Sequence, residues 1–244
     1  MGLDLGALSD EMRLDEWVRI VRRIADEHIE QGWNHYVFRL IRTVFANNPE
    51  LSREGGFIMA WIADNYAERA LMLVRRELDT HGRAESLVNL LLDMSQHPRV
   101  LTRLRHHRVL WHCEDAHDYS LADYAFEKFE LVRFSSCPDN DHLDPAGVQR
   151  DSGTVRASAE RLRKHAQQTL AHRTPQKSIG RGEFTYGDLH RAICDIREVV
   201  LKYYTLLTST CIAQWEPVAQ FNVVRPFTQA WVHDPESFRI DESH

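Results

Sequence analysis

The chain has 244 residues, and its 30 Lys and Arg against 36 Asp and Glu give a formal net charge of -6. This acidic balance argues against a protein that coats duplex DNA, because such proteins carry a basic excess that releases counterions from phosphate. The 43% hydrophobic and 27% charged content is that of a globular chain, and only 11 Gly and 8 Pro interrupt it, a scarcity of helix breakers that favours an all-α fold.

Helical periodicity dominates the first third of the chain. Ser9 is a predicted N-cap, and apolar positions recur at helical spacing over residues 12–44. We expect Gly32 to break or bend this helix and the Asn-Asn-Pro turn at residues 47–49 to end it. The spacing predicts a second long helix over residues 57–78.

Shorter elements are expected in the middle of the chain. Residues 87–94 and 100–104 are predicted to form two helices divided by Pro98, and residues 121–132 a third. Turn-forming residues fill the stretch 135–147, which is predicted to be a long loop.

Two more helices are predicted before the composition changes. Apolar spacing predicts one over residues 155–170, and Thr185 with Asp188 forms a capping-box pattern that begins another. Helices of this length joined by short loops are expected to lie antiparallel in a bundle. Beyond Cys211 prolines recur every nine residues, but two copies of the surrounding pattern are too few for a repeat fold. We expect the spacing to be a coincidence and this segment to be an extended arm that packs on the bundle or on a second subunit.

Charge is segregated along the sequence. Residues 97–112 contain four Arg and no acid, and residues 156–173 contain five basic residues against one acid, so each run carries +4. Residues 113–144 hold nine acids against two basic residues, or -7. An acidic chain can therefore present a basic face, the alternative being that both signs are simply solvated.

Cysteine usage and the N-terminus indicate a soluble cytoplasmic protein. The four cysteines form no C-x-x-C pair, which favours a reducing compartment over a disulfide framework. Cys194 is expected to be buried and inert. The six Trp are expected to be core residues more often than stacking platforms, and Trp111, beside the Arg run, is the one candidate for base stacking. Residues 1–24 mix charged with apolar positions, so we expect no signal peptide, and no charge-free apolar run approaches the ~18 residues of a membrane span.

The His-rich segment 106–117 raises the question of a metal. His107, His112 and His117 are five residues apart, and Cys113 precedes His117 by four. Their side chains could meet around one ion only if the segment were helical. The neighbouring acids favour a solvated connector, so we predict no metal and no cofactor. Phosphate-binding Gly loops, GxSxG elbows and HExxH helices are all missing from the sequence.

Two motifs stand close together in the second half of the chain. RLRKHAQQTLAHR ends in Ala171, His172 and Arg173, and FTYGDLHRAICDIREVVLKYYTLLT follows after a glycine-containing loop. With these motifs the chain resembles the HEPN superfamily between residues 57 and 208. In the abortive-infection (Abi U-type) branch of that superfamily, a helix ending in Ala-His-Arg precedes a Tyr-Asp-Leu helix start and a final helix rich in Tyr and Leu. Residues 61–91 are similar to the long helix, Arg-Asp turn and shorter helix of that branch.

The resemblance implies an HEPN-like up-and-down helical bundle over residues 51–210, with a helical extension over 1–50 and a C-terminal arm over 211–244. It implies a homodimer and, as in many members, metal-independent RNA cleavage in bacterial phage defence. Such cleavage needs a base that activates the 2′-hydroxyl and an acid that protonates the leaving oxygen. It also needs a cation that stabilises the charge developing on phosphorus. His172 would then be the acid or base. The residues expected to line the site beside it are Gln168, His165 and Arg173. The residues expected to bind RNA are Arg161, Arg163, Lys164, Arg75 and Arg76.

The sequence departs from the family pattern before His172. The Arg-Asn pair that members place there is replaced by Ala166 and Gln167, which leaves the R-x4-6-H motif degenerate. The alternative function is therefore a catalytically inactive HEPN scaffold that binds a partner defence or antitoxin protein, or senses a phage component. A helical domain without any nucleic-acid role is a third possibility. No membrane partner is expected in any of these.

Overall fold

The computed structural model describes residues 8–110, 119–166, 185–216, 218 and 225. It is 76% helical with one two-stranded sheet, which confirms the predicted all-α class. The α-helices are α1 (Asp10–Ala46), α2 (Pro49–Glu54), α3 (Gly56–Glu77), α4 (Leu87–Gln96), α5 (Arg103–Arg105), α6 (Tyr119–Glu127), α7 (Pro145–Ala166) and α8 (Tyr186–Thr208). The other elements are antiparallel β1 (Val132–Arg133) and β2 (His142–Leu143), two 3-10 turns (Pro98–Val100 and Pro138–Asn140) and a π-helical turn (His106–Leu110).

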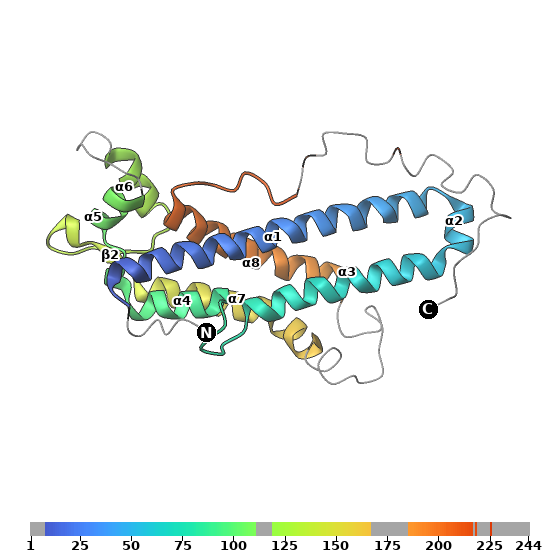
Figure 1. Ribbon diagram of the computed structural model, residues 1–244, viewed down its shortest axis with the longest axis horizontal. Helices are drawn as coiled ribbons and strands as arrows, with labels where there is room; N and C mark the ends of the chain where they lie inside the picture. The colour runs from blue at the N-terminus through green and yellow to red at the C-terminus, as the bar shows by residue number, and fades with distance from the viewer. Residues whose placement is uncertain (1–7, 111–118, 167–184, 217, 219–224, 226–244) are drawn as a thin grey trace, which may run out of the picture.

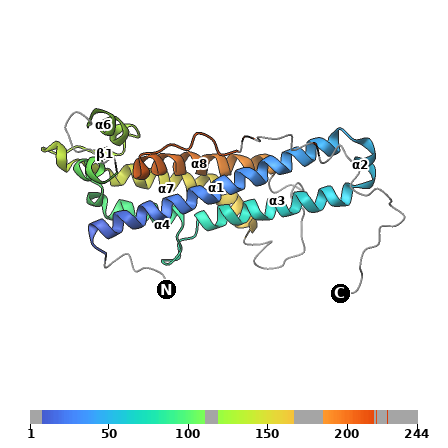
Figure 2. The same cartoon turned by 45° about the horizontal axis from the view of Figure 1, so that its top comes forward.

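A long antiparallel hairpin, α1 and α3 joined through α2, is the largest feature of the structure (Figure 1). α1 has 37 residues, or about 55 Å at 1.5 Å per residue. The half of the hairpin far from α2 packs against α4, α7 and α8, whereas the half that carries α2 extends beyond them, as both views show (Figures 1 and 2). We call residues 49–61 the apex of the hairpin.

Apolar side chains of six helices, α1, α3, α4, α6, α7 and α8, meet in one core. The largest buried residues include Trp17 on α1, Leu91 on α4 and Tyr203 on α8. Polar groups at the edge of this core have partners: the Trp17 indole donates to Asp93 at 2.7 Å, and the Tyr203 hydroxyl donates to Asp151 at 2.8 Å. These two bonds join α1 to α4 and α8 to α7.

The ends of the long helices follow the sequence signals. Ser9 accepts a hydrogen bond from the backbone N–H of Met12, and Asn48 caps α2 in the same way. Thr185 and Asp188 form the predicted capping box at the start of α8. These caps satisfy N–H groups that have no partner inside the helix.

Gly32 does not break or bend the first helix, so that prediction was wrong. α1 is one continuous helix through residue 32. Its backbone at this point lies so close to the chain after α8 that a Cβ on Gly32 would overlap the carbonyl oxygen of Trp215. The glycine is therefore explained by a tertiary contact and not by local helix breaking.

The middle of the chain differs most from its prediction. Residues 100–104 form no continuous helix, because a 3-10 turn ends at Val100 and α5 begins only at Arg103. The helix predicted over 121–132 ends at Glu127, and Val132 pairs with Leu143 in the small sheet. The loop predicted over 135–147 therefore contains β2 and the start of α7.

Arg103 organises this region. Its guanidinium lies 2.6 Å from Asp123, 2.5 Å from Glu127 and 3.0 Å from Asp141, and its side chain is buried. A residue of the basic run 97–112 is thus neutralised by three residues of the acidic run 113–144. Charges that are separated along the sequence are therefore paired in the structure. The run 97–112 thus contributes less positive surface than its formal charge of +4 indicates.

No helix within the described ranges is both long enough and apolar enough to cross a membrane.

Candidate functional site

The residues that the HEPN resemblance selects are only partly described. His172, Arg173 and Gln168 lie outside the described residues. Arg161, Arg163, Lys164 and His165 belong to the last two turns of α7, and the structure describes their helical backbone.

Arg75 and Arg76, predicted to bind RNA, lie in the last turn of α3, which packs against α7. Arg75 is exposed to solvent. Arg76 instead pairs with Glu27 of α1 at 2.5 Å. One of the two arginines is thus already neutralised in part within the hairpin.

A different group of polar side chains meets where α1, α3 and α8 pack together. The His35 Nδ1 atom on α1 lies 2.8 Å from the Tyr66 hydroxyl on α3. The His35 ring stacks on the His190 ring of α8, with centroids 4.6 Å apart and an interplanar angle of 14°. The Cys194 Sγ atom lies 3.6 Å from the His190 Nε2 atom. We call these four residues the histidine cluster.

The capping box of α8 fixes the α8 part of this cluster. It sets the helix start at Tyr186, and His190 and Cys194 then follow at intervals of four residues on the same face. The Tyr186 ring lies near Phe38 and Tyr66. Contrary to expectation, Cys194 is only half-buried and has an imidazole beside it.

Burial keeps the central pair of the cluster neutral. Desolvation and, to a smaller extent, the neighbouring His190 lower the pKa of His35 to about 4. The carboxylate of Glu216 acts in the opposite direction but does not offset them. Desolvation also raises the pKa of Tyr66 to about 12. At neutral pH Tyr66 therefore keeps its proton and His35 is neutral, so the direction of their hydrogen bond depends on the His35 tautomer. Glu216, 3.6 Å from Nε2, favours the tautomer with the proton on Nε2, in which Nδ1 accepts from the Tyr66 hydroxyl.

A carboxylate and two arginines surround the pair. Glu216 lies 3.6 Å from His35 Nε2 and 3.3 Å from the exposed Arg39 guanidinium. Arg197 of α8 donates to the His28 carbonyl at 2.7 Å and lies over the Trp215 ring. The site thus holds proton donors, proton acceptors and cations within one small volume.

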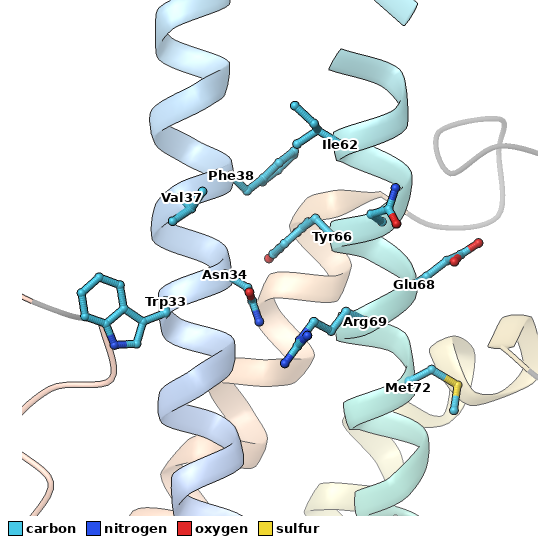
Figure 3. A pocket seen from close by; sticks show the side chains of 10 residues that line it. Trp33, Asn34, Val37, Phe38, Ile62, Tyr66, Glu68, Arg69 and Met72 are labelled. Carbon is cyan, nitrogen blue, oxygen red and sulfur yellow. The ribbon is translucent and has the colours of Figure 1, made fainter. Parts of the chain in front are cut away.

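Tyr66 connects the cluster to a groove between α1 and α3 (Figure 3). The groove has a volume of about 680 Å³, and Trp33, Val37, Ile62 and Met72 contribute to its walls. Tyr66 stacks on Phe38 with ring centroids 4.3 Å apart. The ring of Tyr66 therefore lines the groove, while its hydroxyl contacts His35 within the histidine cluster.

The apex of the hairpin carries large apolar side chains in water. Phe57 is 83% exposed, Trp61 61% and Ile58 54%. No charged residue occurs from 57 to 63. The core location that is expected more often for a Trp therefore holds for Trp17 but not for Trp61.

Metal ligation has no support in the described part of the chain, where no group of three or more His, Cys, Asp or Glu could hold an ion. His107, one member of the His-rich segment, lies 3.0 Å from Asp123. Residues 111–118, with the remaining potential ligands, lie outside the described residues.

No local sequence pattern pointed to the histidine cluster. Its α1 and α3 members are 31 residues apart, and His190 is distant from both. A helix-face pattern shows which side of each helix is buried, but not which side chains face each other across helices.

Comparison of the chain with protein-family models, with curated proteins and with solved structures finds no match.

Proposed function

We propose that this chain is an HEPN-type scaffold of bacterial abortive infection that binds a partner protein through the apex of its α1–α3 hairpin. The observation that carries the proposal is the exposure of Phe57, Ile58 and Trp61 within little more than one turn of α3. Exposed apolar patches of this kind mark interaction sites in soluble proteins.

The chemistry of the apex fits a protein interface. Aromatic residues, Trp above all, dominate the energetic centres of such interfaces, and charged residues are depleted there. The uncharged run 57–63 has this composition, and the acids Asp64 and Glu68 follow it along α3. The partner is therefore expected to present an apolar surface with a polar border.

Protection of bacteria against phage tests the proposal. The double variant Phe57→Asp/Trp61→Asp is expected to fold normally, because both side chains are exposed, and to lose protection. The matched control is Met12→Asp, exposed at the opposite end of α1, which keeps it. Full protection by the double variant would reject the apex as the binding surface, and no protection by the wild-type chain would reject the defence role.

The second candidate is metal-independent RNA cleavage, and the histidine cluster favours it. The stacked rings of His35 and His190 bring two imidazoles together, each with nitrogens that can donate or accept a proton, and the segment with His172 joins α8 one turn before His190. In such cleavage a base takes the 2′-hydroxyl proton, the resulting oxygen attacks phosphorus, and an acid protonates the leaving 5′-oxygen. An arginine stabilises the charge that develops on the phosphoryl oxygens.

RNA cleavage by the purified protein in EDTA separates the two candidates. An RNA endonuclease cleaves in EDTA, arrests growth on expression and loses activity in His172→Ala and His190→Ala. Cleavage that survives His172→Ala unchanged would exclude that residue as acid or base. A scaffold shows neither cleavage nor growth arrest.

A further inference from the structure

The chain after α8 turns back along α1. α8 ends at Thr208, and Ser209 follows in the left-handed conformation with φ of 56°. Residues 211–216, which we call the strap, then lie on the bundle, where Ile212 and Trp215 pack against the core.

The contacts of the strap define its direction. Trp215 lies against His28, with ring centroids 6.0 Å apart, and against Gly32. The next residue, Glu216, contacts His35 and Arg39, further along α1. The strap therefore runs parallel to α1 and towards α2.

An uncovered apolar stripe lies on another side of α1 from the strap contacts, partly level with them and partly beyond Arg39. Trp33, Val37, Leu40 and Val44 occupy one side of the helix at intervals of four, three and four residues. Trp33 and Val37 are each 44% exposed, and Leu40 and Val44 are partly exposed. Leu40 follows Arg39, the last contact of the strap, by one residue, or about 100° round the helix.

We propose that residues 217–244 bind this α1 stripe within the same chain. The segment begins at the end of the strap, whose last contact, Arg39, is about 100° round α1 from Leu40 of the stripe. Extended, its residues reach up to about 90 Å, whereas α1 from Arg39 to Ala46 spans about 10 Å. From 217 to 232 the segment has one charged residue, Arg225, and repeated large apolar side chains, among them Phe227 and Trp231.

Burial of apolar surface supplies the free energy for this contact. The stripe and the segment each carry apolar side chains, and the strap holds them close together, so binding needs little further loss of chain entropy. The proposal does not rest on the proposed function, because the apex residues Phe57 and Trp61 are not part of the stripe.

Hydroxyl-radical footprinting of the full chain, read by mass spectrometry, tests the proposal. In the wild-type protein Trp33 is expected to be oxidised slowly, and the double variant Phe227→Asp/Trp231→Asp raises its rate severalfold. Met12, exposed on the first turn of α1 far from the stripe, is the internal control and keeps its rate. Equal Trp33 rates in the two proteins would overturn the proposal.

Gly32→Ala provides a second, independent perturbation, because a Cβ there displaces the strap. It is expected to raise the Trp33 rate severalfold, whereas Gly153→Ala, with open space around its Cβ, leaves the rate unchanged. Light scattering identifies the monomeric concentration range. Protection of Trp33 that disappears on dilution to monomers would assign the covering segment to a second copy and overturn binding within one chain.

Discussion

Gly32 of α1 lies directly against the backbone carbonyl of Trp215, so that any larger residue at position 32 would overlap the strap. The guanidinium of Arg197 covers the other side of this contact, over the Trp215 ring. One missing methyl group in the longest helix thus allows the chain after α8 to pack on it.

Gly32→Ala is expected to destabilise the protein by about 1–3 kcal/mol, the usual cost of overpacking. In an open helical position the same substitution stabilises, by about 1 kcal/mol, because alanine has the higher helix propensity. Gly153→Ala on α7 supplies that control, since nothing lies near its Cβ. Urea unfolding measures both, and a stabilised Gly32→Ala variant would contradict the close contact.

Arg103→Met is expected to cost about 3–5 kcal/mol, because it leaves the buried Asp141 carboxylate without its cation. Arg99→Met removes an exposed arginine from the same run and is expected to have little effect. Adding Asp141→Asn to Arg103→Met recovers part of the loss, which thermal unfolding can measure. Equal stabilities of the two single variants would show that the ion cluster contributes little.

Glu77 and His28 give the protein a specific pH dependence. Their side chains are buried 3.9 Å apart. Desolvation raises the pKa of Glu77 to about 7, and desolvation with the charges of Arg197 and Arg76 lowers the pKa of His28 to about 3. Between about pH 3 and pH 7 Glu77 is therefore mostly protonated and His28 is neutral.

The contribution of Glu77 to the free energy of unfolding is fully present below 4.5, the pKa of the residue in the unfolded chain. It is lost as the pH rises to about 7, the pKa in the folded protein. Glu77→Gln lacks this loss, so its stability relative to wild type is expected to rise across that window by up to about 3 kcal/mol. Unfolding at pH 4.5 and pH 7.5 measures the change. Glu198→Gln, at an exposed position on α8, is the control, and a parallel pH profile of wild type and Glu77→Gln would contradict the raised pKa.

Tyr66→Phe keeps the ring against Phe38 and removes the hydroxyl that donates to His35. Loss of this one hydrogen bond is expected to cost about 1 kcal/mol. Nitrogen NMR of the imidazole is expected to show one His35 tautomer in the wild type, with the proton on Nε2, and two in the variant. Tyr124→Phe, exposed on α6, leaves both readouts unchanged. A single tautomer in Tyr66→Phe would show that Tyr66 does not position His35.

Local sequence signals sufficed where each residue acts within its own helix. Ser9 and the Thr185–Asp188 capping box located two helix starts, and residues 47–49 located the end of α1. The same reasoning failed over residues 121–147. There Arg103 pairs with two acids of α6 and with Asp141, and Val132 pairs with a strand that local spacing does not reveal.

The sequence by itself determined that this acidic chain with few helix breakers folds into long helices, because periodicity and capping depend on neighbouring residues. Only the tertiary structure decided which charges are paired, why position 32 is glycine, and that His35, Tyr66 and His190 meet. Those outcomes depend on distances between residues far apart in the chain, which packing sets and helical spacing does not encode. The net charge of -6 is therefore a property of the sequence, while the neutralisation of Arg103 is a property of the fold.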